Sequence, residues 1–308
     1  MFWRSRGHIP TAVDSRQEWS THREQVSESS EQQVVIVGSS YMQMGFSTDT
    51  FRRMHPDTQL TQLAVSGGGN ALPVLRDLAM DDSFHGIVIC SLREAWLTSV
   101  DAFEQKSYVD YYRKKYTFAD KLECSLRNWV SSRSVVLSAS EVRPDSVVRM
   151  LSEGRGLPTP SYLTLQKDRW LLADYSKTDA DDIRRKWYQS KNRPTGREQA
   201  SLDSSGEIVD LNPCVERIKR RGGAVIFVKM PVAHYVRPFA AQKTSGSPVW
   251  QKFAKSTLAV AINSRDHKRF DALEFQDPHH LDFRQAGVFT KELLTLLDEL
   301  EIVPIGEN

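Results

Sequence analysis

Val34-Val35-Ile36-Val37-Gly38-Ser39-Ser40-Tyr41 is the stretch of this chain that decides its fold. Its four consecutive β-branched residues predict a short strand that is buried on both faces, as in a parallel sheet. Gly38-Ser39-Ser40 then predicts a tight turn at the carboxyl end of that strand, where open α/β sheets bind their ligands. Such a turn can hold a phosphate through its backbone N–H groups, or it can present a serine as a nucleophile.

The other end of the chain supplies a possible base for that serine. Asp277-Pro278-His279-His280-Leu281 stands just before the last predicted helix. A serine hydroxyl is a weak nucleophile until a base takes its proton, and an imidazole can accept that proton and return it. A carboxylate fixes the orientation of the imidazole and stabilises its charged form. The residue types leave His279 as a competing base and Asp271 and Asp282 as alternative carboxylates.

The two ends together resemble the SGNH (GDSL-type) hydrolase family. Its first block is a strand followed by Gly-Asp-Ser, and its last block is Asp-x-x-His before a terminal helix. The resemblance maps the nucleophile to Ser40, the base to His280 and the orienting carboxylate to Asp277. A bacterial, exported and often membrane-anchored branch is more similar, because it has Gly-Ser-Ser in the first block. It also carries an Arg-Gly-Gly strand segment, here Arg221-Gly222-Gly223, and a His-Leu ending. The likeness covers roughly residues 2–95 and 209–300.

The family's oxyanion donors are only partly represented in this chain. Its second block contains a glycine after a strand, which maps to Gly67 in the turn Ser66-Gly67-Gly68-Gly69-Asn70. The resemblance implies that the Ser40 and Gly67 N–H groups hold the oxyanion. The third block, Gly-x-Asn-Asp, is replaced by Ser91-Leu92-Arg93-Glu94, so the asparagine donor is absent. We expect Asn70 or a second backbone N–H to point into the space beside Ser40.

The remaining periodicity predicts a three-layer α/β/α sandwich with a mainly parallel, five-stranded sheet, as in SGNH hydrolases and flavodoxin-like proteins. Four more strands are expected, at 59–65, 86–90, 224–228 and 257–262. Helices are expected at 48–54, directly after the serine turn, and at 71–80, 212–221 and 285–300. Residues 1–32 are expected to form an N-terminal arm, and residues 33–308 a single SGNH hydrolase-like domain.

A helical insertion of that domain is expected at about 99–208, packed over the catalytic edge. Within it we expect a hairpin at 162–175 and a helix at 180–189. Its first part is rich in aromatic residues, for which core packing is favoured over a sugar-binding platform: Phe103, Tyr108, Tyr111, Tyr112, Tyr116 and Trp129.

Composition limits the partners. The 41 basic and 39 acidic residues give a formal net charge of +2, which offers no electrostatic argument for binding nucleic acid. The spacing of Cys90, Cys124 and Cys214 fits no metal site, and no metal or organic cofactor is implied. The sequence contains no run of 18 apolar residues, so no transmembrane helix is expected within it. The resemblance nevertheless implies an exported or periplasmic protein, with a membrane anchor upstream of this sequence.

The sequence therefore predicts a serine esterase or O-acyltransferase that acts on acyl esters, in particular acetyl esters. The resemblance implies cell-envelope or extracellular polysaccharide as the substrate. Arg237 is expected either to bind an anionic substrate group or to form a surface salt bridge. Two other classes stay open: a phosphate- or nucleotide-binding flavodoxin-like protein, and a catalytically degenerate SGNH-like domain that binds glycan or a partner. The oligomeric state is left open.

Overall fold

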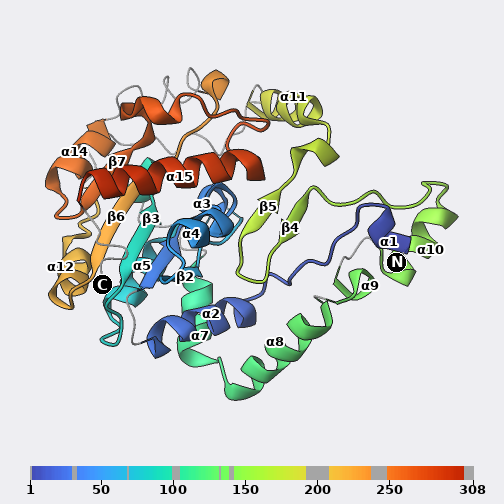
Figure 1. Ribbon diagram of the computed structural model, residues 1–308, viewed down its shortest axis with the longest axis horizontal. Helices are drawn as coiled ribbons and strands as arrows, with labels where there is room; N and C mark the ends of the chain where they lie inside the picture. The colour runs from blue at the N-terminus through green and yellow to red at the C-terminus, as the bar shows by residue number, and fades with distance from the viewer. Residues whose placement is uncertain are drawn as a thin grey trace.

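The computed structural model is centred on a five-stranded, all-parallel sheet (Figure 1). It describes residues 2–29, 33–67, 69–98, 105–131, 133–138, 142–191, 208–236 and 248–301. The strand order is β2-β1-β3-β6-β7. The strands span Gln33–Val37 (β1), Gln59–Gln62 (β2), Ile87–Ser91 (β3), Ala224–Lys229 (β6) and Val260–Asn263 (β7). The predicted α/β sandwich with five strands is confirmed, and every strand pair in the sheet is parallel.

Helices cover both faces of the sheet because the strands bury apolar side chains on both sides. Val35 and Val37 of β1 face one core, and Val34 and Ile36 face the other. The first core is closed by α2 (Arg16–Glu28), α5 (Leu72–Ala79), α6 (Glu94–Thr98), α12 (Asn212–Arg220) and α14 (Pro248–Ser256). The second core is closed by α3 (Ser40–Gly45), α4 (Thr48–Met54) and α15 (Phe283–Glu299). The result is the three-layer arrangement of an open α/β fold.

The helix after the serine turn differs from the prediction. A separate six-residue helix, α3, begins at Ser40 itself, and the expected helix α4 follows it. Ser47 caps α4 by accepting a hydrogen bond from the N–H of Thr50 at 3.2 Å. The expectation that Thr48–Met54 directly follows the turn was therefore wrong, because the chain makes one short helix before the Ser47 cap starts the next.

The segment expected as an N-terminal arm contributes a core helix. Residues Phe2–Ser5 form α1, and α2 follows a β-region cap at Ser15. Trp19 of α2 is fully buried and donates its indole N–H to the Leu63 carbonyl at 2.9 Å. Burying an indole of this size stabilises the fold by about 1.5–3 kcal/mol. Helix α2 thus belongs to one face of the sandwich.

The chain between β3 and β6 contains the expected hairpin and mostly helices. The hairpin pairs β4 (Leu163–Leu165) with β5 (Leu171–Ala173), and the expected helix at 180–189 is present as α11 (Ala180–Lys191). Besides α6 and α12, the described part of this stretch forms α7 (Lys106–Lys114), α8 (Phe118–Ser131), α9 (Val135–Ser138) and α10 (Pro144–Ser152). The stretch also contains the short 3₁₀ turn Tyr175–Lys177 (η2). The turns His234–Val236 (η3), Ser264–Asp266 (η4) and Lys268–Phe270 (η5) come after β6.

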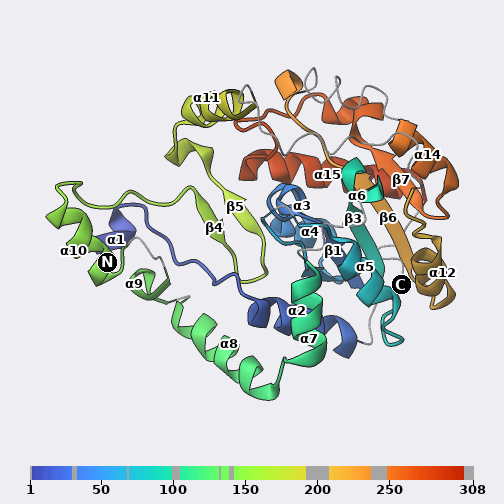
Figure 2. The same ribbon diagram turned by 180° about the vertical axis from the view of Figure 1, so that it is seen from behind.

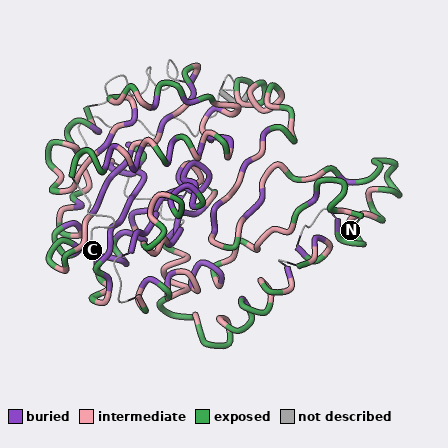
Figure 3. Tube along the Cα trace, in the orientation of Figure 1, coloured by how far each residue is buried: buried purple, intermediate pink, exposed green. Residues whose placement is uncertain are grey.

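This region divides into two parts in space. Helices α8, α9 and α10 extend away from the sheet. Strand β5 packs against α3, and α11 lies on the α15 side of the molecule (Figure 2). Buried segments concentrate in and around the sheet, and long exposed segments run along α8 and α10 (Figure 3). In the described part of the chain, no helix is long and apolar enough to cross a bilayer, and no group of three metal-binding side chains occurs.

Candidate active site

The serine turn is held by close packing at the carboxyl edge of the sheet. A Cβ on Gly38 would lie 2.2 Å from Ser91 Oγ and 2.8 Å from Met42 Cβ, so no larger residue fits there without movement. Ser39 then forms an isolated parallel bridge with Val65, which extends the pairing of β1 and β2. This packing places Ser40 as the first residue of α3, with its side chain partly buried.

Ser40, His280 and Asp277 form a continuous hydrogen-bonded chain. His280 Nε2 lies 3.0 Å from Ser40 Oγ, which is the distance of a good hydrogen bond. On the other side of the ring, His280 Nδ1 lies 3.0 Å from Asp277 Oδ2 and 3.1 Å from Oδ1. The structure thus brings together the three residues that the two ends of the sequence suggested, across 240 positions of chain.

The loop before α15 is folded around the Asp277 carboxylate. Its Oδ1 accepts hydrogen bonds from the backbone N–H groups of His279 at 2.6 Å and His280 at 2.8 Å. Burial alone raises the pKa of Asp277, but the His280 ring and these two N–H donors outweigh it and hold the pKa below its ordinary value. Leu281 is buried in the core between sheet and α15 and anchors the loop. The carboxylate is therefore held in its charged form.

The competing residues have other places. The His279 ring packs against Tyr41 and Trp187, with ring centroids 5.4 and 5.9 Å apart. Asp282 caps α15 by accepting from the N–H of Arg284 at 2.9 Å, and it also accepts from the N–H of Tyr175 at 3.1 Å. Asp271 stands at the end of η5. His280 is the imidazole that the structure sets against Ser40.

The side of the site that is expected to hold the oxyanion, called the oxyanion side below, has fewer hydrogen bonds. Gly67 has φ +110°, a conformation that favours glycine, and it is exposed. Asn70 is 1% exposed; its Oδ1 accepts from the N–H of Leu72 at 2.9 Å, and its Nδ2 has no hydrogen-bond partner in the described part of the chain. Neither Gly67 nor Asn70 hydrogen-bonds to Ser40 within that part. A buried, unpartnered donor at this edge of the sheet suits a group that waits for a ligand.

Gln105 ties the two turns of this side together, a connection that the sequence did not indicate. Its Nε2 donates to the carbonyl of Gly38 at 2.9 Å and to that of Gly69 at 3.0 Å. The side chain is buried and comes from the start of α7. The glycine turn that precedes Asn70 is thereby fixed beside the serine turn. Arg237, the expected anion-binding residue, lies outside the described residues.

An aromatic group around the Asp277 loop was also missed. We call Tyr41, Tyr162, Tyr175, Trp187, Tyr188 and Tyr235 the aromatic wall. Tyr41 follows the serine and lies 5.4 Å from the His280 ring. Burial and then the Asp277 charge raise the pKa of Tyr235 to about 12 and raise that of Tyr175 as well. Tyr175 and Tyr235 therefore stay neutral near pH 7, and the wall frames the His280 side of the site.

The aromatic residues noted in the first part of the expected insertion do not belong to this wall. Tyr108 and Tyr112 are partly buried and meet Trp19 of α2 edge to face, with ring centroids 5.9 and 6.4 Å apart, against the core on that face of the sheet. Trp129 is 57% exposed on α8, and Phe103 lies outside the described residues. The wall comes instead from α3, the flanks of the hairpin, α11 and η3, segments too far apart in the sequence to share a periodic signal.

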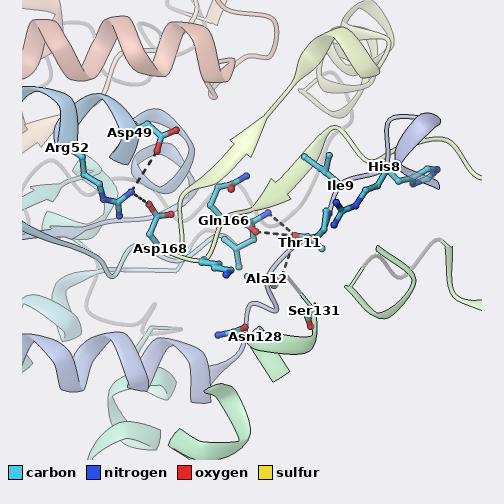
Figure 4. A pocket seen from close by; sticks show the side chains of 14 residues that line it. His8, Ile9, Thr11, Ala12, Asp49, Arg52, Asn128, Ser131, Gln166 and Asp168 are labelled. Carbon is cyan, nitrogen blue, oxygen red and sulfur yellow. Dashed lines mark hydrogen bonds and ion pairs between the residues drawn. The ribbon is translucent and has the colours of Figure 1, made fainter. Parts of the chain in front are cut away.

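A separate cavity of about 690 Å³ lies between the N-terminal segment and the turn of the hairpin (Figure 4). Arg52 of α4 reaches Asp168 at 2.6 Å and Asp49 at 3.8 Å, so its charge is already compensated. Thr11 seals the opposite wall by accepting from the N–H of Leu165 at 2.9 Å. None of Ser40, Asp277 and His280 lines this cavity.

Comparisons with known proteins give no family for this chain. No protein-family model matches it, and no curated protein matches it either.

Proposed function

We propose that this protein is an SGNH-type serine esterase or O-acyltransferase that acts on acyl esters, in particular acetyl esters. One observation carries the proposal: the hydrogen-bonded chain from Ser40 Oγ through both nitrogens of His280 to Asp277. A nucleophile, a base and an orienting carboxylate in this order are recognised by geometry and role. The resemblance of the first and last blocks to SGNH hydrolases adds the reaction class.

Each residue then has a defined task. Ser40 Oγ attacks the ester carbonyl carbon while His280 Nε2 takes the hydroxyl proton. The tetrahedral intermediate collapses, the C–O bond to the alcohol breaks, and His280 returns the proton to the leaving oxygen. His280 next takes the proton of the acceptor hydroxyl, whose oxygen attacks the acyl-Ser40 carbonyl; the bond from the acyl carbon to Oγ breaks, and His280 returns the proton to Ser40 Oγ. Asp277 holds the ring through Nδ1 and stabilises its charged form, with its own charge secured by two backbone donors.

Water as the acceptor makes an esterase, and a sugar hydroxyl makes an O-acyltransferase. The negative charge that develops on the carbonyl oxygen needs donors, for which the backbone N–H groups of Ser40 and Gly67 and the Asn70 Nδ2, unpartnered among the described residues, are the candidates. Polysaccharide as the substrate, and export of the protein, follow from the resemblance alone. Aromatic side chains around the base side supply flat apolar surfaces of the kind on which sugar rings pack.

The two other classes explain less of the site. A phosphate cradle would use the backbone of Gly38-Ser39-Ser40 and leave the Ser40–His280 hydrogen bond without a task. A domain that only binds glycan would not need Asp277 to be kept charged against its burial. Ester chemistry uses all three groups.

The test is release of acetate from p-nitrophenyl acetate and from an O-acetylated polysaccharide. Ser40→Ala should remove turnover of both substrates. Ser39→Ala is the matched control, because the buried Ser39 hydroxyl has no hydrogen-bond partner among the described residues. Thermal melts check that each variant is folded. Equal activity of wild type and Ser40→Ala on both substrates would contradict the proposal.

A further inference from the structure

Arg93 stands at the mouth of the site, where the resembling family has its asparagine. It is the second residue after β3, at the same carboxyl edge as the serine turn. Its guanidinium carbon lies 5.5 Å from the centroid of the Tyr41 ring, and that ring lies 5.4 Å from His280. Tyr41 is the residue next to Ser40. A fixed positive charge is thus one aromatic ring away from the reacting hydroxyl and its base.

The charge of Arg93 is not compensated by the acids beside it. Its neighbour Glu94 is buried and pairs with Lys229 from β6. Asp277, the acid of the site, pairs with His280 at 3.0 Å. Among the described residues, the side chain of Arg93 forms neither an ion pair nor a hydrogen bond, and it is exposed. The contact that orients it is the face of Tyr41.

Stacking on Tyr41 uses the face of the guanidinium and not its N–H donors, which have no partner among the described residues. A cation over an aromatic ring is held by the ring's electron-rich face, while its donors point outward in the plane of the fork. This fork matches the two oxygens of a carboxylate or a phosphate. An ester whose carbonyl lies at Ser40 and whose substituent passes over Tyr41 brings that substituent to Arg93.

We propose that Arg93 selects substrates that carry an anionic group, a carboxylate or a phosphate, close to the scissile ester. The inference rests on the proposed ester chemistry of Ser40 and adds the charge of its substrate. Arg93 acts on substrate binding and positioning, so its removal lowers kcat/KM for anionic esters and spares neutral ones.

The test compares esters that share one scissile bond. The probes are 3-acetoxybenzoate, 3-acetoxyphenyl phosphate and the neutral isostere 3-acetoxybenzamide, with acetate release measured for each. We expect wild type to prefer at least one anionic ester over the amide by about fivefold in kcat/KM, the contribution of a well-placed exposed ion pair. The preference should shrink in high salt. The anionic ester that wild type prefers shows whether Arg93 favours a carboxylate or a phosphate.

Three variants separate the explanations. Arg93→Gln should bring the anionic-to-neutral ratio to about one, and Arg93→Lys should restore part of it. Arg220 is exposed at the end of α12, on the opposite edge of the sheet, so Arg220→Gln should leave the anionic-to-neutral ratio unchanged. An equal loss on the neutral and anionic esters in Arg93→Gln would overturn the inference, since Arg93 would then act on the oxyanion or on folding. An unchanged ratio would also overturn it.

A binding measurement keeps this inference apart from the proposed chemistry. NMR titration of the Ser40→Ala protein with 3-acetoxybenzoate, 3-acetoxyphenyl phosphate and 3-acetoxybenzamide needs no turnover. Anion-dependent binding that disappears in the Ser40→Ala, Arg93→Gln double variant supports the inference even where wild type hydrolyses nothing. In that case only the ester chemistry fails. Equal binding of all three probes would overturn the inference.

Discussion

The two sides of the candidate site are built to different degrees. On the base side, every polar atom of the Ser40–His280–Asp277 chain has a partner between 2.6 and 3.1 Å, and two backbone donors fix the carboxylate. On the oxyanion side, Gly67 is exposed and Asn70 Nδ2 has no partner among the described residues. Here Arg93 replaces the asparagine of the resembling family.

This difference is what the proposed ester chemistry requires. The base of such a site must be oriented before the substrate arrives, so its hydrogen bonds should be complete in the free protein. Oxyanion donors must be free until charge develops, and their partner is the reacting oxygen. The base side can therefore be tested by removing hydrogen bonds that are present in the free protein. The oxyanion side must be tested by removing hydrogen-bond donors whose partner would be the substrate.

The largest effect is expected on the base side from His280→Ala. Removing the base should lower kcat by up to about 10⁶, as in other serine triads, because Ser40 then has no acceptor for its proton. The Ser40→Ala, His280→Ala double variant should be little worse than either single one, since the two residues act as one unit. Steady-state release of acetate measures all three. Losses that multiply in the double variant would show that the two residues act independently.

Asp277→Asn should cost less, on the order of 10⁴ in kcat. The amide can still accept from the N–H groups of His279 and His280, so the loop keeps its fold, but its NH₂ facing His280 Nδ1 selects the wrong tautomer. A pH–rate profile with thermal melts as the control measures this. Activity of Asp277→Asn within tenfold of wild type would show that Asp277 does not orient His280 for catalysis.

The same variant has a stability signature with a definite sign. The pKa of Asp277 is lowered in the folded protein, so its contribution to stability is present above the ordinary carboxyl pKa. That contribution is lost as the pH falls through the lowered, folded pKa. The stability difference between wild type and Asp277→Asn should therefore be largest near neutral pH and shrink in acid. Urea unfolding over a pH series measures it, and a constant difference would contradict the lowered pKa.

On the oxyanion side, Asn70→Ala should lower kcat by about 10²–10³ if the Asn70 Nδ2 holds the oxyanion. The substitution also removes the acceptor for the Leu72 N–H, which destabilises the start of α5 by about 1 kcal/mol. Asn70→Ser separates the two effects, because a hydroxyl can accept in its place yet does not reproduce the amide donor. Full activity in both variants would leave backbone N–H groups as the donors.

The smallest effects concern the two glycines that shape the turns. Gly38→Ala forces a Cβ against Ser91 Oγ and Met42 Cβ and should cost about 1–3 kcal/mol of unfolding free energy. A Cβ at Gly67 would meet nothing within 4 Å, so only the positive φ opposes Gly67→Ala, at about 1–2 kcal/mol. Urea unfolding compares the two. A larger cost at Gly67 would mean that the second turn is more tightly packed than the first.

Local patterns predicted the framework of the fold and one side of the site. The run Val34–Val37 and the Gly38-Ser39-Ser40 turn are signals within a few residues, and parallel strands gather such turns at one edge. The spacing from Asp277 to His280 lets one loop hold both groups. Short range is what made these features visible in the sequence.

The missed features depend on contacts between distant segments. The Gln105 side chain reaches Gly38 across 67 residues, and the aromatic wall collects residues from four separate elements. The short helix α3 has six residues and no cap hydrogen bond from a side chain, so no local signal marks it. Arg93 was seen only as a departure from the family pattern, and its contact with Tyr41 came from the structure.

Labelling with a fluorophosphonate probe tests directly whether the Ser40 hydroxyl is activated as a nucleophile. The probe reacts with a serine whose hydroxyl is activated by a neighbouring base, and mass spectrometry of the digested protein identifies the modified peptide. We predict one label per chain on Ser40, with labelling abolished in Ser40→Ala, strongly slowed in His280→Ala and retained in Ser39→Ala. No labelling of folded wild type, or labelling of another serine while Ser40 stays unmodified, would contradict it.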